Sequence, residues 1–427
     1  MNPDLLKESE QVFGEYDRLR KFSSKFKTYP AQKAANIVYS MQNLAEQIAE
    51  TEVPQNHDEL LESELKRRLH GEALSLEQIL SGRNLSFAEV IAKNGIPPSD
   101  IINLQDWLGA NKKSAEQAIE RLFEGTELAD RDLDIRLDIP SVKRQVEEFA
   151  AVHIERYHST IGRLVEDISN VGGFLRDIRA VPTTQPRSYF NLYTNTLAIG
   201  IPAIAYTNSG GDLQIRERDL IALYGHEGMG HALNTVMTRS NGVPHFLQRE
   251  SEIALSTMES VAQFYEKIIF EDLKQSTETQ KRLGIQHHFD DIYQESRDMQ
   301  FINDYQRSLQ HYAIAILANP SLGEPHDPET IKKKVAIIRN VSLDPGFAQP
   351  FVESHRYHFD LEGNLHPDLV RELIYCAKPV QRALDEFAKE GIKYEGDARS
   401  NIDATLLKGF WTPIGYVDNA RLKAQGK

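Results

Sequence analysis

The spacing of apolar residues along the chain follows a helical period over most of its length. In residues 4–163, apolar side chains recur every three to four positions, the pattern of amphipathic helices that bury one face. Ser86 and Glu89 have the spacing of a capping box, and Gly95 is placed to end the helix that they begin. Pro140 is suited to the first turn of a further, long helix. The pattern therefore predicts a mainly α-helical protein.

One stretch in the middle of the chain departs from the helical pattern. Residues 197–208, with the sequence LAIGIPAIAYTN, are apolar and β-branched enough for a strand, and residues 209–212 have the composition of a turn. Two helical stretches follow, over residues 216–237 and 250–273. We therefore expect a small β-sheet beside the helix at residues 216–237, within an otherwise helical body.

That helix carries the most informative run of the chain, HEGMGH at residues 226–231. In zinc metallopeptidases, two histidines on one helical face bind the metal and the glutamate after the first histidine acts as general base. The usual spacing between the histidines is four residues, whereas here it is five. On a regular helix, this leaves the second imidazole about 140° from the first, against about 40° for a spacing of four. We therefore predict a wide π-type turn, eased by Gly228 and Gly230, that returns His226 and His231 to one side of the helix.

A third metal ligand is expected on the helix over residues 250–273. Glu259 is the best candidate, because it lies in the middle of that helix among apolar residues, where an unpaired carboxylate is costly to bury. Glu266 lies seven residues further on, close to the same helical face, so it can hydrogen-bond a ligand histidine. The alternative for Glu259 is an ordinary carboxylate in contact with solvent.

Residues 201–266 resemble the catalytic core of the thimet oligopeptidase and oligopeptidase F family of zinc peptidases. The shared features are a strand that ends in Asn, here IPAIAYTN, then a His-Glu helix, here GHEGMGHALN, and then a helix with a pattern of the type Glu-x-x-Ser-Gln-x-x-Glu, here ESVAQFYE from Glu259 through Gln263 to Glu266. The sequence departs from that family by one extra residue between the histidines, a spacing that resembles the His-Glu-x-x-Gly-His of dipeptidyl peptidase III. The likeness covers about 65 residues of the chain.

The resemblance implies a peptidase that hydrolyses short peptides. It implies that His226, His231 and Glu259 hold one zinc ion, that Glu227 is the general base toward water activated at the metal, and that Gln263 and Glu266 support the ligands. We also expect the substrate backbone to lie along the strand over residues 197–208, in contact with Ala203, Ala205 and Asn208.

Residues 353–360, ESHRYHFD, lie about where the resemblance places a histidine and tyrosine cluster. His355, Tyr357 and His358 are candidate donors to the oxyanion that forms during hydrolysis, since a phenol or neutral imidazole can stabilise that charge. Arg356 could bind a substrate carboxylate through two hydrogen bonds. Tyr416 is a second candidate for the tyrosine role. Ordinary polar residues without a catalytic role are the alternative for this segment.

Composition limits the expected partners and the expected cellular compartment of the protein. The chain has 427 residues, and its 49 basic and 63 acidic residues give a net charge of −14, which argues against nucleic acid as a partner. One cysteine excludes an intramolecular disulfide and suits a reducing compartment, and neither a secretory signal nor an apolar run of membrane-spanning length is readable. We therefore expect a cytoplasmic enzyme without membrane partners, with a helical region over residues 1–180 and a catalytic region over residues 181–427.

Two other functions fit the same residues. One is a metal-dependent hydrolase or processing enzyme with a dedicated non-peptide substrate, since the five-residue spacing can reshape the site. The other is a helical scaffold whose metal site is structural or lost. A structural zinc site usually has four protein ligands, so the number of donors around the metal distinguishes this alternative.

Overall fold

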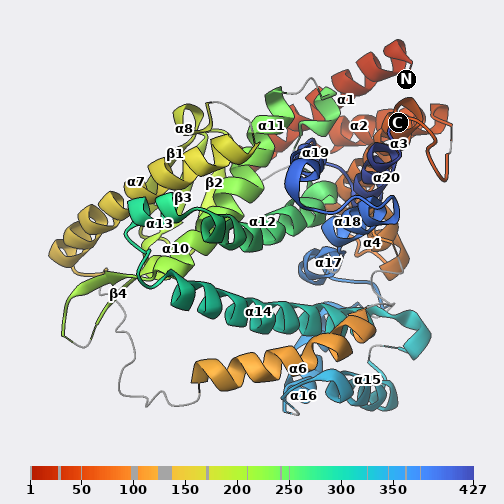
Figure 1. Cartoon of the computed structure of the whole chain (residues 1–427). Coiled ribbons are helices and arrows are strands. Elements are labelled where there is room, and N and C mark those ends of the chain that lie inside the picture. Colours follow the sequence, from red (N-terminus) through yellow and green to blue (C-terminus); the bar gives the residue numbers. More distant parts are fainter. Residues whose placement is uncertain are drawn as a thin grey trace.

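The protein folds into a mainly helical body with a small sheet, as the periodicity predicts (Figure 1). The computed structural model describes residues 2–26, 30–49, 51–97, 104–123, 137–169, 173–208, 210–240, 243–249, 251–324, 326–344, 346–360, 363–375 and 377–427.

The helices before the sheet are α1 (Pro3–Phe26), α2 (Ala31–Gln47), α3 (His57–Ser81), α4 (Phe87–Asn94), α6 (Leu104–Phe123), α7 (Pro140–Ser169) and α8 (Phe174–Asp177). Those that follow it are α10 (Glu217–Leu223), the π-helix η2 (Tyr224–Leu233), α11 (Asn234–Ser240), α12 (Leu255–Gln275), α13 (Thr277–Leu283), α14 (Phe289–Ala318), α15 (Pro328–Val341), α16 (Ala348–His355), α17 (Pro367–Ile374), α18 (Pro379–Lys389), α19 (Gly396–Leu406) and α20 (Pro413–Ala424). Short 3₁₀ turns are η3 (His245–Leu247), η4 (Glu252–Ala254), η5 (Pro320–Leu322) and η6 (Arg356–His358).

The helix ends predicted from Ser86, Gly95 and Pro140 are confirmed. The Ser86 hydroxyl accepts a hydrogen bond from the Glu89 N–H, and the Glu89 carboxylate accepts one from the Ser86 N–H. Gly95 ends this helix in the left-handed conformation, where a residue without Cβ is least strained. Pro140 begins α7, also as predicted.

The expected strand over residues 197–208 is wrong as a single element. The chain instead forms β3 (Thr196–Gly200), a helical turn α9 (Ile201–Ile204) and β4 (Ala205–Thr207), which pairs with β5 (Leu213–Ile215) in a separate hairpin. Pro202 explains the break, because it lacks an N–H for a strand ladder and suits the first turn of a helix.

A three-stranded sheet lies beside the π-helix. Its order is β1 (Arg179–Thr183), β3, β2 (Tyr189–Asn191), with β1 parallel and β2 antiparallel to β3. Strand β2 is therefore an edge strand, and it packs against η2. The π-helix is thus held between the sheet on one side and α12 on the other (Figure 1).

Two large clusters of buried apolar residues form most of the interior, and a small third one consists of Ala254, Met258 and Phe410. The first joins α1–α3, α7, the sheet, η2, α12 and α18–α20, whereas the second joins α4, α6 and α15–α17. Helix α14 connects them, because Phe289 and Ile292 lie in the first cluster and Leu309 and Leu317 in the second. Each large cluster takes residues from before and after residue 180, so the expected division of the chain at that point stays a prediction.

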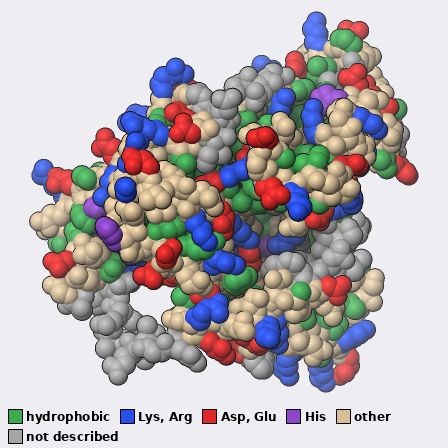
Figure 2. Space-filling view, viewed as in Figure 1, with side chains coloured by type: hydrophobic (Ala, Val, Ile, Leu, Met, Phe, Trp, Pro, Cys, Tyr) green, Lys and Arg blue, Asp and Glu red, His purple; other side chains and the backbone are tan. Residues whose placement is uncertain are grey.

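The surface mixes both signs of charge. Figure 2 shows acidic and basic side chains interspersed over this face, and a hollow between the α12–α18 region and the α14 layer. Among the described residues, no helix has both the length and the apolar character that crossing a membrane requires.

Candidate metal centre

The helix that carries HEGMGH is wound as a π-helix over the whole run Tyr224–Leu233. The predicted wide turn is confirmed, and it extends over ten residues where a single turn was expected. Hydrogen bonding between residues five apart places side chains at that spacing nearly above one another. His226 and His231 consequently face the same side, with ring centroids 5.2 Å apart.

Glycines let this helix lie against α12. A Cβ built on Gly230 would be 2.3 Å from the Cα of Ala262, and one built on Gly225 would be 2.8 Å from the carbonyl oxygen of Tyr265. Both neighbours are backbone atoms of α12, which no side-chain rotation can move. Gly228 instead faces the Tyr224 ring of its own helix, 2.9 Å from a built Cβ. The glycines were expected to relax the helix, and the structure adds that Gly225 and Gly230 permit close approach of two backbones.

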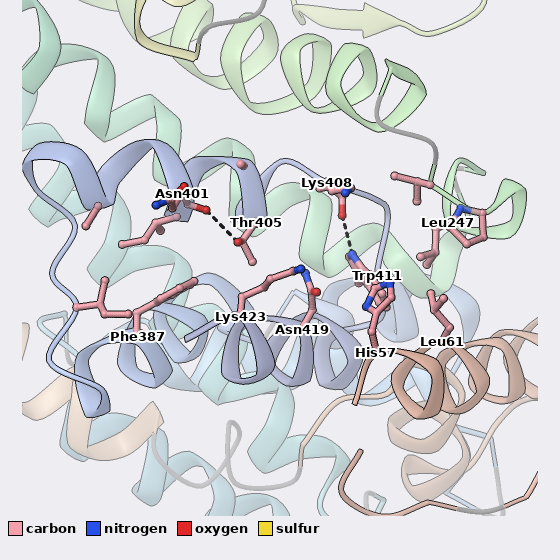
Figure 3. A pocket seen from close by; sticks show the side chains of 16 residues that line it. His57, Leu61, Leu247, Phe387, Asn401, Thr405, Lys408, Trp411, Asn419 and Lys423 are labelled. Carbon is pink, nitrogen blue, oxygen red and sulfur yellow. Dashed lines mark hydrogen bonds between the residues drawn. The ribbon is translucent and has the colours of Figure 1, made fainter. Parts of the chain in front are cut away.

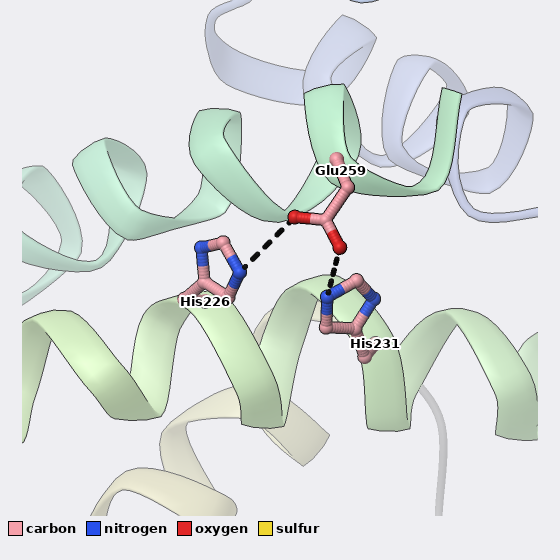
Figure 4. A group of neighbouring side chains, drawn as sticks. All are labelled: His226, His231 and Glu259. Atoms are coloured by element: carbon pink, nitrogen blue, oxygen red, sulfur yellow. Dashed lines mark ion pairs between the residues drawn. The ribbon is translucent and has the colours of Figure 1, made fainter. Parts of the chain in front are cut away.

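Close approach brings the third predicted donor between the two histidines. The Glu259 carboxylate has one oxygen 3.6 Å from His226 Nε2 and the other 3.7 Å from His231 Nε2 (Figure 4). One ligand atom from each of the three residues lies within 4.8 Å of the others. Among the described residues, no fourth His, Cys, Asp or Glu joins this group.

Glu266 orients the first histidine. Its Oε2 accepts a hydrogen bond from His226 Nδ1 at 3.2 Å, which leaves Nε2 directed toward Glu259. The predicted contact between Glu266 and a ligand histidine is therefore present, and it is the arrangement that fixes ring orientation at metal sites. Gln263 lies on α12 one turn after Glu259 and is half-buried.

The carboxylates around His226 and His231 shift the pKa values of this group of residues. Burial opposes protonation of His226, but hydrogen bonds to Glu259 and Glu266 outweigh it and raise its pKa to about 10. Burial lowers the pKa of His231 to about 4. Burial also opposes ionisation of Glu259 and Glu266, yet the hydrogen bonds of His226 and its charge, with a contribution from Arg307, lower both pKa values. The carboxylates of Glu259 and Glu266 thus stabilise a positive charge between the two imidazoles. Two imidazole nitrogens and a carboxylate are a set of ligand atoms that suits a divalent cation such as Zn²⁺.

Glu227, the proposed general base, contacts the sheet, whereas the three candidate ligands lie between η2 and α12. Glu227 is 8% exposed, and its Oε2 accepts a hydrogen bond from the Phe190 N–H of β2 at 2.9 Å. Burial raises the pKa of this carboxyl. A carboxylate with a raised pKa is a better proton acceptor near neutral pH, which is the property a general base needs.

Phe190 also identifies the strand next to the site, and it was not predicted. Its N–H points to Glu227, away from β3, so the open edge of β2 borders the base. Ala203 lies in the turn α9, Ala205 pairs with Ile215 in the hairpin, and Asn208 holds the hairpin turn through hydrogen bonds. None of these three residues lies in β2, the strand that borders Glu227, and their expected contact with a substrate stays a prediction.

Arg307 is a second residue that the sequence did not indicate. It lies on α14, three residues after Asp304, which forms an ion pair with Lys267 of α12. Residues three apart share a helical face, so Arg307 is also directed toward α12. Its charge acts on Glu259, Glu266 and His311, and no ion pair or hydrogen bond involving it is found among the described residues. No local pattern signals such a contact, since it depends on how two distant helices pack.

None of residues 353–360 belongs to the group formed by His226, His231 and Glu259. His355 ends α16 and stacks on Phe351, and η6 follows with Arg356, Tyr357 and His358. Arg356 donates a hydrogen bond to the hydroxyl of Tyr357 and lies over its ring, and Tyr357 is 73% exposed. Helix α16 packs on α14 and α15, and it contributes to the second apolar cluster (Figure 1).

The expected roles of residues 353–360 and of Tyr416 therefore stay predictions. The catalytic roles expected for His355, Tyr357 and His358, and the carboxylate contact expected for Arg356, gain no support from this placement. Tyr416 is buried, and its hydroxyl donates to the Leu406 carbonyl at 3.0 Å.

Comparison of the chain with protein-family models, with curated proteins and with solved structures finds no match. The resemblance to the thimet oligopeptidase and oligopeptidase F family therefore stays a prediction that rests on the residues around the site.

Proposed function

We propose that this protein is a metal-dependent hydrolase, most simply a zinc peptidase that cleaves peptide bonds of short peptides. The observation that carries the proposal is the convergence of His226, His231 and Glu259 on one point, with their ligand atoms within 4.8 Å of one another. Three protein donors leave room for a water or substrate oxygen, as catalytic zinc sites do.

The proposed chemistry divides between the metal and the protein. Zn²⁺ held by the three donors would supply Lewis acidity toward a scissile carbonyl and a water molecule. Glu227 would take a proton from that water and deliver it to the leaving amine. The hydrogen bond from Phe190 holds the Glu227 carboxylate in place, and burial makes it more basic than an exposed glutamate.

The open edge of β2 supports an extended peptide as the substrate. An unpaired strand edge can bind a peptide backbone through main-chain hydrogen bonds. Because the Phe190 N–H on that edge is donated to Glu227, a peptide beside β2 would pair with the remaining main-chain groups of the edge and run past the base.

Arg307 supports a substrate with a free carboxylate. An arginine without a direct partner among the described residues, facing the site from α14, is suited to bind the terminal carboxylate of a short peptide. Arg307→Ala should then raise KM for peptides with a free carboxyl terminus and leave KM for the matching C-terminal amides nearly unchanged. Arg297→Ala, an exposed arginine on the same helix, is the matched control. Equal effects of Arg307→Ala on acids and amides would remove this role.

The central experiment separates metal binding from turnover. Purified protein should contain about one zinc per chain by elemental analysis, and His231→Ala should lose it. Glu227→Gln should keep the metal and cleave a library of short peptides about 10²–10⁴-fold more slowly, since the amide still accepts the Phe190 hydrogen bond but takes no proton. Unchanged turnover in metal-free Glu227→Gln would overturn the mechanism.

The same preparation tests the two alternatives. Cleavage of ester or amide substrates without cleavage of any library peptide would favour a hydrolase with a dedicated non-peptide substrate. X-ray absorption spectroscopy of the bound metal gives the number of its protein ligands. Four protein ligands, together with no hydrolysis of any substrate, would favour a structural site.

A further inference from the structure

A cavity lies away from the proposed metal centre, among α3, η3, α18, α19 and α20 (Figure 3). Its volume is about 590 Å³, within the range of roughly 300–1,000 Å³ that is usual for small-molecule sites. None of the three metal-ligand candidates lines it. The proposed hydrolysis therefore assigns no role to this cavity.

Its inner wall is apolar. Leu61, Leu247, Phe387 and Trp411 line it and are buried. Trp411 fixes its own ring by donating a hydrogen bond from Nε1 to the Lys408 carbonyl at 2.7 Å. A rigid aromatic and aliphatic wall favours a ligand with an apolar body.

Its charged residues are all basic. Lys408 and Lys423 are exposed residues of the lining, and no Asp or Glu is among the lining residues, in a chain whose net charge is −14. Both lysines lie near enough to His57, a third lining residue, for their charges to lower its pKa in addition to burial. No ion pair of either lysine is found among the described residues. The charged side chains that line the cavity are thus basic, although the protein is acidic as a whole, and Asp58 is an acidic neighbour of His57.

One buried polar group also lies in the lining. Asn419 is 4% exposed, and its side chain has no hydrogen bond to any described residue. Figure 3 shows it beside Lys423 on α20, on the side of the cavity that Thr405 of α19 faces. The Asn419 amide therefore faces the cavity, where it can donate a hydrogen bond to a ligand.

We propose that this cavity binds a small carboxylate with an apolar body, such as a medium-chain fatty acid. The carboxylate would lie between Lys408 and Lys423 and accept a hydrogen bond from the Asn419 amide. The apolar body would lie against Phe387, Leu247 and Trp411. This proposal is independent of the proposed hydrolase activity, because it uses none of the same residues.

Trp411 provides a direct measurement. The chain has two tryptophans, so Trp107→Phe leaves Trp411 as the single fluorophore, at the wall of the cavity. Titration of this variant with sodium decanoate should change its fluorescence saturably, and calorimetry should give the same Kd. Three comparison compounds separate the contributions of the apolar chain and of the carboxylate. Decanol has the chain without a charge, decyltrimethylammonium has the chain with a positive charge, and acetate has the carboxylate without the chain. We expect decanoate to bind at least tenfold more tightly than each of them.

Substitutions in the same background assign the contacts. Lys408→Ala with Lys423→Ala should weaken decanoate at least tenfold and change decanol binding less than twofold. Asn419→Leu, which keeps the size of the side chain, should act in the same direction. Lys389→Ala with Lys393→Ala is the matched control, since neither residue lines the cavity. Absence of a saturable decanoate response, equal binding of decanoate and decyltrimethylammonium, or no loss in the double lysine variant would each overturn the proposal.

Discussion

Replacement of Gly230 by alanine tests the contact on which the metal centre depends. The added Cβ would lie 2.3 Å from the Cα of Ala262 and 2.7 Å from its Cβ. Carbon atoms in ordinary contact are about 3.5–4.0 Å apart, so η2 and α12 would have to separate by about 1 Å. Ala262 lies three residues after Glu259, so this shift would draw the Glu259 carboxylate away from His226 and His231.

The expected effects follow from that displacement. Overpacking of this kind typically lowers the free energy of unfolding by about 1–3 kcal/mol. An offset of about 1 Å at a ligand should also weaken zinc binding, by roughly tenfold or more, as loss of a supporting contact does. Chemical denaturation measures the first quantity, and competition with a chromogenic chelator measures the second.

Gly14→Ala is the matched control for the glycine substitution. Gly14 is also helical, but nothing lies within 4 Å of a Cβ built there, so alanine should stabilise α1 by about 0.5–1 kcal/mol without affecting the metal. If Gly230→Ala binds zinc as tightly as the parent and unfolds with the same free energy, then close packing of η2 on α12 does not fix the site.

Three further predictions address the surroundings of the site and the fold. Glu266→Ala removes the acceptor of His226 Nδ1 and should weaken zinc binding about 10–100-fold, measured by the same chelator competition. Burial lowers the pKa of His311 to about 3, below its ordinary value of 6.5, so the unfolded chain binds a proton that the folded chain does not. Stability should therefore fall by up to about 1.4 kcal/mol per pH unit as the pH drops from 6.5 toward 3, and His311→Gln should reduce this slope whereas His326→Gln, at an exposed position, should not. Ser86→Ala removes the cap of α4 and should cost about 1 kcal/mol in thermal or chemical unfolding; an unchanged unfolding free energy would contradict the capping role.

The sequence by itself determined the features that depend on neighbours along the chain. The capping box at Ser86 and the start of α7 at Pro140 are formed by residues within one turn of each other. The five-residue spacing of His226 and His231 predicted a wide helical turn because the angle between side chains on a helix depends only on their separation. Glu259 and Glu266 could be placed on one face of a single helix for the same reason.

Other features were decided by the tertiary structure alone. Strand β2 borders Glu227, although residues 197–208 have the stronger strand pattern, because the local pattern does not determine which strand becomes the edge beside a helix. Arg307 faces the carboxylates only through the packing of α14 on α12. Tyr357 has suitable chemistry for an oxyanion donor, yet it lies in η6, after α16, where its side chain is exposed. Contacts between distant helices depend on the shape of whole surfaces, which periodicity along one segment does not encode.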